Sequence, residues 1–150
     1  TALKREVFYT AVEKFPLSMD TIQRLNYKRY IEPVYTEVFQ RLHASPWNQV
    51  NRLNNRFLLN KMKVDWLDFQ PENLFDLVYF DAFAPDKQPE MWSLDLFRRL
   101  YQQIGEEGVL VTYSAKGLIK RRLKEAGFQV ENLEGPPGKR EMIRAVKRDG

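Results

Sequence analysis

The sequence predicts an α/β domain whose sheet is mostly parallel and carries an antiparallel strand at its C-terminal end. Apolar residues alternate along the chain between short runs typical of buried strands and the three-to-four-residue spacing of amphipathic helices. Helices separate most of the predicted strands, and a strand–helix–strand crossover makes neighbouring strands parallel. The Gly-Pro-Pro-Gly turn at residues 135–138 instead joins the last two strands directly, which makes them antiparallel neighbours.

In the N-terminal half, residues 7–12 form a β-branched and aromatic run that predicts a buried strand. Ser18 is typical of the N-cap of a short helix, and Pro33 begins a second helix. The polar residues 48–56 predict a loop or a short turn. Residues 57–66 alternate well enough between apolar and polar side chains to predict a half-buried strand.

The C-terminal half predicts strands and helices in alternation, followed by a final pair of strands. The expected elements are strands at 75–80, 108–113, 128–133 and 142–146, a helix from Ser93 to Gly105, and a helix at 116–126. Gly127 ends the second of these helices. In open sheets of this kind, ligands bind outside the carboxyl ends of the strands. This rule selects Glu13, Asp65, Asp81 and Ser114, because each lies at or near the end of a predicted strand.

The composition excludes several classes of protein. A chain of 150 residues that is 43% hydrophobic is sufficient for one compact domain, so we treat residues 1–150 as a single domain. It has no Cys and a single histidine, His43, which excludes disulfides, thiolate metal sites and multi-His metal sites. We therefore expect no metal. We also expect no membrane span, because no apolar run approaches the roughly 18 residues required, and, with no signal peptide in view, a cytoplasmic location.

Basic residues are concentrated in the C-terminal third of the chain. The whole sequence has 24 Lys and Arg against 20 Asp and Glu, a net charge of +4. Residues 115–148 alone contain ten basic and four acidic residues, a local balance of +6. Such a segment can bind phosphates by releasing their counterions. From charge alone, the solvated face of a basic protein is the simpler interpretation.

Residues 81–85, Asp-Ala-Phe-Ala-Pro, place a carboxylate between a buried strand and a loop that contains two prolines. A carboxylate at a strand end in a partly apolar cleft can bind an amine substrate and accept its proton. The alternative is that Asp81 caps a turn of the loop. The polar and aromatic residues that continue to Trp92 are typical of a shaped loop over a site.

Two further acidic residues lie at predicted strand ends. Glu13 ends the first strand, where a carboxylate can accept hydrogen bonds from both hydroxyls of a ribose. Asp65 follows another strand, where it can accept from an adenine amine while Trp66 or Leu67 covers the ring. The simpler alternatives are a solvated glutamate beside Lys14 and an ordinary turn aspartate.

A pair of cations, Lys139 and Arg140, follows the two prolines between the last two strands. Arg140 can bind a phosphate through two parallel hydrogen bonds, and Lys139 adds charge. A charged hairpin is the alternative. Tyr113 and Ser114 end a neighbouring predicted strand and are expected to face the same crevice as Asp81.

The motifs together closely resemble those of the MnmC-type methyltransferases. Residues 75–85 (FDLVYFDAFAP) and 87–92 (KQPEMW) match the family's motif of Asp, Ala or Gly, Phe, Ala or Ser and Pro, followed by a Lys-x-Pro segment that ends in Trp. Residues 138–142 (GKREM) match the family near the C-terminus. The resemblance extends from Glu6 to about Lys147.

This resemblance implies a Rossmann-like methyltransferase that uses S-adenosylmethionine. Members of the family methylate the aminomethyl group of 5-aminomethyl-2-thiouridine at the tRNA wobble position, so the implied partner is the anticodon loop of tRNA. No flavin-binding oxidase domain is apparent in this chain, which resembles the methyltransferase part of a bifunctional member or a stand-alone member. The sequence has no glycine before Gly105. We therefore expect the domain to lack the family's first strand and glycine-rich loop, to be N-terminally incomplete and to bind the cofactor poorly by itself.

The resemblance also implies roles for particular residues. In-line methyl transfer from a sulfonium to a neutral amine requires aligned reactants, and Asp81 is the implied catalytic residue that orients the amine. The implied cofactor-binding residues are Glu13, Lys14, Asp65, Trp66, Asp81 and Phe83. The implied RNA-binding residues are aromatic side chains that can stack on an unstacked uridine and cations that can bind phosphates. They are Lys87, Trp92, Tyr113, Lys116, Lys120, Arg121, Lys139 and Arg140. Phe83 is a further candidate for stacking.

Two other functions stay open. A methyltransferase or aminopropyltransferase that acts on a small amine also places a sulfonium donor and an amine acceptor near a strand-end aspartate. The basic C-terminal segment argues against it, because polyamines require acidic surroundings. A non-catalytic RNA-binding module would bind tRNA with strong salt dependence and show no thermal shift with S-adenosylhomocysteine. A nicotinamide oxidoreductase is disfavoured, because nothing in the sequence resembles its Gly-x-Gly-x-x-Gly turn.

Overall fold

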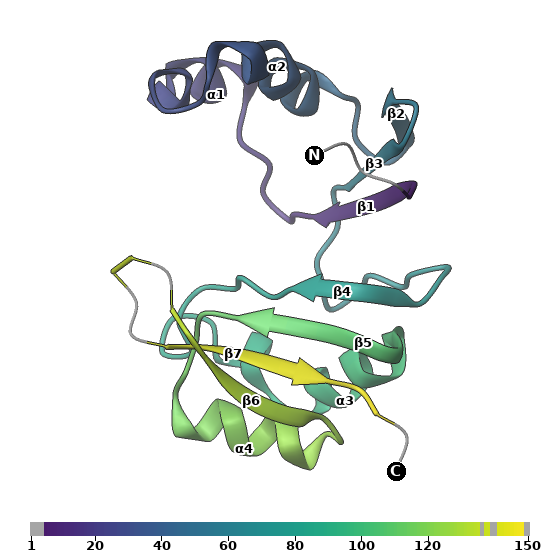
Figure 1. Cartoon of the computed structure of the whole chain (residues 1–150), viewed down its shortest axis with the longest axis vertical. Helices are drawn as coiled ribbons and strands as arrows, with labels where there is room; N and C mark the ends of the chain where they lie inside the picture. Colours follow the sequence, from purple (N-terminus) through teal and green to yellow (C-terminus); the bar gives the residue numbers. More distant parts are fainter. Residues whose placement is uncertain (1–4, 136, 139–140, 149–150) are drawn as a thin grey trace. The chain divides into compact units, whose positions relative to one another are not determined.

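The computed structural model describes residues 5–135, 137–138 and 141–148 (Figure 1). The chain divides into two compact units, unit 1 over Thr1–Gln70 and unit 2 over Pro71–Gly150. Each unit contains its own β-sheet, one of three strands and one of four. The predicted α/β class is confirmed, with helices and strands in both units.

Unit 1 contains a sheet of order β1-β3-β2 and two short helices. Its elements are β1 (Val7–Val12), α1 (Met19–Arg24), the 3-10 turns η1 (Asn26–Arg29) and η2 (Pro33–Tyr35), α2 (Thr36–Ala44), β2 (Val50–Asn54) and β3 (Phe57–Met62). β1 runs parallel to β3, whereas β2 pairs with β3 in the antiparallel sense. As predicted, Ser18 caps α1, because its side chain accepts a hydrogen bond from the backbone N–H of Thr21.

The prediction of a loop or short turn at residues 48–56 is wrong, because residues Val50–Asn54 form the strand β2. Its side chains alternate between exposed and half-buried positions, which is the period of a strand with one covered face. The side chain of Asn54 accepts a hydrogen bond from the N–H of Arg56 at 2.8 Å and stabilises the tight turn into β3. Only two of the five residues of β2 are apolar, so the hydrophobic pattern of the sequence gives little indication of the strand.

Unit 2 contains a sheet of order β4-β5-β7-β6 and two helices. Its elements are β4 (Phe75–Tyr79), the 3-10 turn η3 (Pro89–Trp92), α3 (Leu94–Gln103), β5 (Ile104–Thr112), α4 (Gly117–Glu125), β6 (Gln129–Glu134) and β7 (Glu141–Val146). β4 and β5 are parallel, and the predicted antiparallel pairing of the last two strands is confirmed. β7 also pairs antiparallel with β5, so each described sheet keeps a single parallel pair and the parallel part is smaller than expected.

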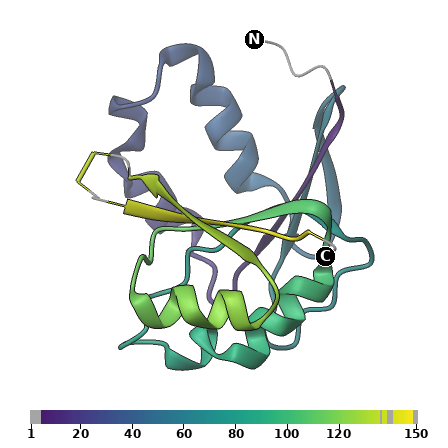
Figure 2. The same cartoon turned by 60° about the horizontal axis from the view of Figure 1, so that its bottom comes forward.

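The core of unit 2 lies between its sheet and the helices α3 and α4, which cover the same face (Figures 1 and 2). Its fully buried residues are Phe97, Leu100, Ile104, Leu110, Ile119, Leu123, Ile143 and Ala145. Gly127 ends α4 as predicted, with a φ of 111° that favours glycine. Gly108 is required for a different reason, because a Cβ at this position would lie 2.5 Å from the side chain of Ile104.

Two features are absent from the described residues. None of their helices combines the length and the apolar composition that crossing a membrane requires. Within the same ranges, no group of three or more His, Asp and Glu side chains is placed to hold a metal ion.

Candidate functional site

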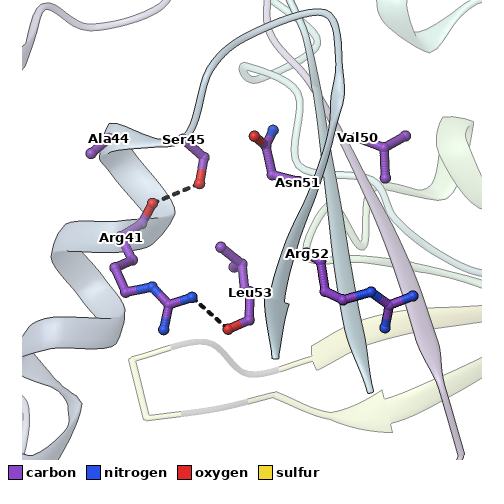
Figure 3. Close-up of a pocket in the computed structure, with 7 residues that line it drawn as sticks. All are labelled: Arg41, Ala44, Ser45, Val50, Asn51, Arg52 and Leu53. Carbon is purple, nitrogen blue, oxygen red and sulfur yellow. Dashed lines mark hydrogen bonds between the residues drawn. The ribbon is translucent and has the colours of Figure 1, made fainter. Parts of the chain in front are cut away.

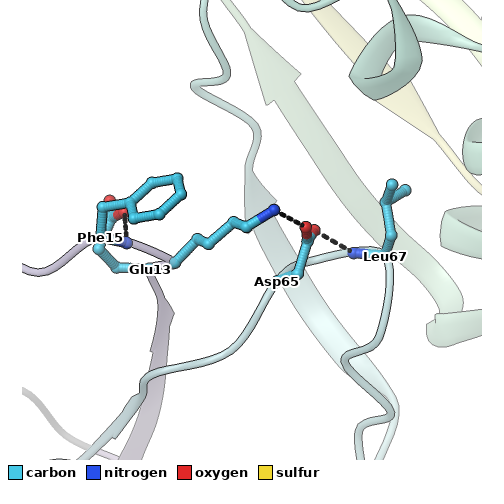
Figure 4. Close-up of polar contacts among 5 residues, drawn as sticks. Glu13, Phe15, Asp65 and Leu67 are labelled. Carbon is cyan, nitrogen blue, oxygen red and sulfur yellow. Dashed lines mark hydrogen bonds and ion pairs between the residues drawn. The ribbon is translucent and has the colours of Figure 1, made fainter.

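Glu13 lies directly after the last residue of β1, at the end of the parallel ladder of unit 1. Its backbone N–H donates to the carbonyl of Met62 at 3.0 Å and extends the pairing of β1 with β3 by one residue. Its exposed carboxylate accepts the N–H of Phe15 through Oε1 at 2.7 Å (Figure 4). Oε2 has no hydrogen-bond partner among the described residues. Because a carboxylate has about four acceptor positions, Glu13 keeps the capacity to bind both hydroxyls of a ribose.

Asp65 lies at the same end of the unit 1 sheet, beside Lys14. The Nζ of Lys14 contacts Oδ2 of Asp65 at 2.6 Å, and the N–H of Leu67 donates to Oδ1 at 2.9 Å (Figure 4). The structure thus brings three of the predicted cofactor residues to one edge, as the strand-end rule expects. Both carboxylate oxygens of Asp65 already have partners in this arrangement. An adenine amine would therefore compete with Lys14 for Asp65 or use a remaining lone pair.

Trp66, the fourth predicted cofactor residue of unit 1, is half-buried and packs on Phe69. The two ring centroids lie 5.3 Å apart and the planes are tilted by 39°. Phe69 is one of the few buried hydrophobic residues of this unit. Trp66 therefore has a packing role, and its contact with an adenine ring stays a prediction.

The residues of unit 1 fit the nucleoside end of S-adenosylmethionine, and Glu13 gives the strongest reason. Its free acceptor positions match a ribose diol, which offers two hydroxyl donors. The methionine end is different. No glycine precedes Gly105 in the sequence, so the residues of unit 1 do not form the glycine-rich turn that such folds use there.

Asp81 lies at the carboxyl end of β4 in unit 2. The N–H of Phe80 donates to the carbonyl of Val111 at 2.8 Å, so the backbone is tied to β5 up to the residue before Asp81. The Asp81 side chain is exposed and makes no hydrogen bond or ion pair with any described residue. A capping role within the described part of the loop is therefore not observed. The carboxylate is free to accept a hydrogen bond from an amine.

The aromatic residues of the 81–92 loop have different environments. Phe83 is 77% exposed, and Tyr113, which follows β5, is 46% exposed, so both offer ring surface to a ligand. Trp92 is only 2% exposed. Its ring packs edge-on against Phe80 at 5.2 Å, and its Nε1 donates to the carbonyl of Phe83 at 2.7 Å. The prediction that Trp92 stacks on a uridine is wrong for this conformation, because the indole is part of the core.

The predicted RNA-binding cations of unit 2 divide into paired and unpaired groups. Lys116 contacts Asp86 at 2.8 Å, and Lys120 contacts Glu141 at 3.2 Å. Two more cations of the basic segment pair with acids, Arg144 with Glu131 and Arg148 with Glu107. Lys87 and Arg121 are exposed and have no acidic partner within the described ranges, so they remain the available phosphate contacts. Lys139 and Arg140 lie outside the described residues.

Arg122 is a residue that the sequence analysis missed. Its Nη1 donates to the backbone carbonyl of Trp92 at 2.7 Å and connects α4 to the end of η3. On α4 it lies three residues after Ile119 and directly before Leu123, both fully buried. This position at the border of the buried helix face is the signal that distinguishes Arg122 from the solvated cations around it.

Unit 1 also has an open pocket of about 460 Å³ beside the C-terminus of α2 and the strand β2 (Figure 3). Arg41 donates through Nη2 to the carbonyl of Leu53 at 2.6 Å, and Ser45 donates through Oγ to the carbonyl of Arg41 at 2.7 Å. None of the residues predicted from the sequence lines this pocket. The hydrogen bond of Arg41 connects α2 to β2, and that of Ser45 closes the C-terminus of α2, so both have a structural role.

Lys61 on β3 is 8% exposed and stabilises the C-terminus of α2. Its Nζ donates to the carbonyls of His43 and Leu42 at 2.8 and 3.2 Å and lies 4.7 Å from the ring centre of Trp47. Burial lowers the pKa of Lys61. Burial and, second, the charge of Lys61 lower the pKa of His43. His43 lies in the last turn of α2, and Lys61 provides the cation that the helix dipole favours there.

The chain is similar to known methyltransferases over most of its length. The model of the S-adenosyl-L-methionine-dependent methyltransferase family matches residues 25–148. The chain is 34% identical over 149 residues to the "tRNA 5-methylaminomethyl-2-thiouridine biosynthesis bifunctional protein MnmC" of Pseudoalteromonas atlantica, which covers 92% of this chain and 21% of that protein. A protein of the same name from Campylobacter fetus is 30% identical over 93% of this chain and 24% of its own length. The chain thus spans about a fifth to a quarter of these curated relatives.

A solved structure supports the fold. MNMC2 from Aquifex aeolicus matches 97% of this chain and 44% of its own chain, with a TM-score of 0.74 and 23% identity. A methyltransferase from Pyrococcus furiosus matches 93% of this chain and 62% of its own, with a TM-score of 0.54 and 17% identity. These likenesses confirm the Rossmann-like fold, and the family model identifies the cofactor class. The chain therefore belongs to the S-adenosyl-L-methionine-dependent methyltransferase family.

Proposed function

We propose that this chain carries the site for methyl transfer from S-adenosylmethionine to the aminomethyl group of a modified wobble uridine in the anticodon loop of tRNA. The observation that carries the proposal is the free, exposed carboxylate of Asp81 at the end of β4. The names of the curated relatives, which refer to biosynthesis of 5-methylaminomethyl-2-thiouridine in tRNA, support the choice of acceptor. A tRNA substrate in turn favours a cytoplasmic location.

The chemistry assigns a separate task to each unit. In unit 1, Glu13 binds the ribose hydroxyls and Asp65 contacts the adenine. When bound, S-adenosylmethionine supplies an electrophilic methyl group on a sulfonium. In unit 2, the Asp81 carboxylate accepts a hydrogen bond from the target amine. This hydrogen bond directs the lone pair of the amine nitrogen toward that methyl group. The bond from the amine nitrogen to the methyl carbon would form as the bond from that carbon to the sulfonium sulfur breaks, with S-adenosylhomocysteine as the leaving group. The nitrogen gains a positive charge in this step, so the carboxylate also stabilises the product ammonium and can receive its proton.

The RNA contacts follow from exposure and charge. Phe83 and Tyr113 present ring surface to an unstacked uridine, because sequence-specific RNA recognition commonly stacks bases on aromatic side chains. Lys87 and Arg121 contact phosphates of the loop, since neither has an acidic partner among the described residues. Lys116 and Lys120 contribute less, because Asp86 and Glu141 already offset their charge.

We further propose that the domain is N-terminally incomplete and that a further strand with a glycine-rich turn completes the cofactor site. In the described sheets, β1 pairs only with β3, and β4 pairs only with β5. Each of these edge strands exposes large apolar side chains: Phe8 and Tyr9 on β1, and Leu77 and Tyr79 on β4. Parallel strands in α/β proteins are usually buried on both faces, so these edges support a missing strand.

The test measures labelled methyl transfer from S-adenosylmethionine to tRNA that bears the unmethylated aminomethyl wobble uridine. It compares this chain with a form extended at its N-terminus by about 50 to 80 residues, roughly one strand–loop–helix unit. Transfer by the extended form alone supports both the acceptor and the incomplete domain. Transfer by the short chain contradicts the incomplete domain. Absence of transfer by both forms, or transfer to spermidine instead of tRNA, overturns the proposed acceptor.

A further inference from the structure

Asp81 lies between two backbone anchors. Before it, the N–H of Phe80 donates to the carbonyl of Val111 at 2.8 Å and continues the ladder between β4 and β5. After it, the carbonyl of Phe83 accepts the Nε1–H of Trp92 at 2.7 Å. A single residue separates Asp81 from this second anchor. The carboxylate has no partner of its own among the described residues, so the two anchors are the contacts that hold the backbone from which it projects.

The indole of Trp92 makes the second anchor rigid. The ring is 2% exposed and lies nearly perpendicular to the ring of Phe80, at 86°, with 5.2 Å between centroids. It also packs at 74° to the fully buried Phe97 of α3. Edge-to-face contacts of this kind fix ring orientation in a close-packed core. The Nε1–H therefore points in a fixed direction, toward the carbonyl of Phe83.

The helix α4 holds the other end of the same segment. Arg122 donates through Nη1 to the carbonyl of Trp92 at 2.7 Å, and the buried residues Ile119 and Leu123 fix α4 against the sheet. A charge-assisted hydrogen bond is stronger than a neutral one. The nearby ion pair of Lys116 with Asp86 is exposed on both sides and contributes much less. Arg122 is therefore the main polar connection from α4 to the loop.

We propose that Trp92 and Arg122 are positioning residues for methyl transfer: they hold the 81–92 loop so that Asp81 faces the target amine, and neither contacts the substrate. The inference rests on the proposed function and adds residues that act through Asp81. Displacement of a reacting group by about 1 Å can lower a rate by about 10²-fold. Loosening either hydrogen bond therefore affects the chemical step more than it affects binding.

The first test is Trp92→Phe in the extended protein, which removes the Nε1 donor and keeps an aromatic ring in the core. We expect kcat to fall by about 10- to 100-fold while KM for tRNA and for the cofactor stays within about twofold. Amide hydrogen exchange gives a readout besides activity: residues 82–88 exchange faster in the variant, and β5 and β7 do not. Trp47→Phe is the matched control in unit 1, and we expect its kcat to stay within about twofold.

The second test uses Arg122→Met, which keeps the apolar stem and removes the donor, alone and together with Trp92→Phe. Because both residues act on one segment, the double variant should be about as slow as the slower single variant. An unchanged kcat in both single variants, with an active wild type, overturns the inference. A rise in KM for tRNA or for the cofactor with no change in kcat also overturns the inference, because Trp92 and Arg122 would then contribute to ligand binding and not to the chemical step. An inactive wild type overturns the proposed function, and the exchange rates at 82–88 then test the two anchors by themselves.

Discussion

The two units differ in how they bury apolar side chains. Among the residues that the structure describes, 18 hydrophobic residues are buried; only Leu59 and Phe69 of these belong to unit 1, and the other 16 belong to unit 2. Neither α1 nor α2 has a buried residue, whereas α3 buries Leu96, Phe97 and Leu100. Burial of apolar area is the dominant favourable term in folding, so unit 2 has a core of its own.

Unit 1 instead relies on polar connections between its helix and its sheet. Arg41 connects α2 to β2, and Lys61 connects β3 to the C-terminus of the same helix. A typical hydrogen bond contributes only about 0.5–1.5 kcal/mol, far less than a packed apolar layer. The comparison indicates that unit 2 provides a rigid frame for Asp81, while the cofactor edge around Glu13 lies on a more weakly stabilised unit.

The largest expected effect separates the chemical roles of the two units. Asp81→Ala should lower kcat by about 10²- to 10⁴-fold and leave tRNA affinity mostly intact, because it removes the group that orients the amine. Glu13→Gln in unit 1 should instead raise KM for the cofactor by about tenfold, with a small change in kcat. Single-turnover rates, tRNA binding and cofactor titration on the extended protein measure both. Equal losses of turnover and tRNA binding in Asp81→Ala would make Asp81 structural.

The next effect tests the difference in core packing. Phe97→Ala should lower the free energy of unfolding by about 3–5 kcal/mol, because Phe97 is fully buried between α3 and the sheet. Val38→Ala on α2 should change it by no more than about 0.5 kcal/mol, since Val38 is 46% exposed. Urea denaturation of both variants gives the values. Similar losses at the two positions would contradict the comparison between the units.

A smaller effect is expected from the buried lysine of unit 1. Lys61→Met removes two hydrogen bonds to α2 and should cost about 1–3 kcal/mol of stability. It should also raise the pKa of His43 toward its ordinary value of 6.5, because the lysine charge is one cause of its lowered pKa. Burial, the larger cause, keeps it below that value. NMR titration of the single histidine measures the shift, and an unchanged His43 pKa would rule out the coupling.

The lowered pKa of His43 gives the sign of the pH dependence of the free energy of unfolding. The pKa of His43 is lower in the folded chain than its ordinary value of 6.5, so the unfolded state binds more protons just below that pH. Stability should therefore decrease as the pH falls through about 6.5 and level off below the folded pKa. In Lys61→Met the decrease should be smaller, because the two pKa values lie closer together.

The smallest effect concerns Arg121, a cation of α4 that has no acidic partner among the described residues. Arg121→Glu should weaken tRNA binding and make the dependence of log K on log salt less steep by about one or more. Arg24→Glu makes the same charge change in unit 1, where Arg24 already pairs with Asp20 at 3.0 Å. It should therefore have less effect on affinity. Equal salt slopes in the two variants would indicate that net charge, rather than a site on α4, binds the RNA.

Much of the fold could be predicted from the sequence, because local signals carry it. The first strand has the predicted bounds, Ser18 and Ser93 cap the helices α1 and α3, and Gly127 ends α4. These features depend on neighbouring residues within one or two turns of chain. The strand β2 was missed because its period of two is carried by polar side chains.

The candidate site was predicted only in part. The rule that ligands bind at the carboxyl ends of parallel strands selects Glu13, Asp65 and Asp81 from the sequence. In the structure, Glu13 and Asp65 lie at one edge of the unit 1 sheet, and Asp81 lies at the end of β4. The rule gives no information about which polar groups are already paired. Lys14 with Asp65, Lys116 with Asp86 and Arg122 with the carbonyl of Trp92 are separated by 51, 30 and 30 residues in the chain.

By itself, the sequence determines the order of helices and strands, the family and the residue types available for methyl transfer. Hydrophobic period, caps and motif spacing are local properties, so they can be read without a structure. The tertiary structure decided which of those residues are free: Asp81 and Arg121 are unpaired within the described ranges, whereas Trp92 is part of the core. Burial and pairing depend on partners far away in the chain, and the spacing of residues in a sequence does not specify them.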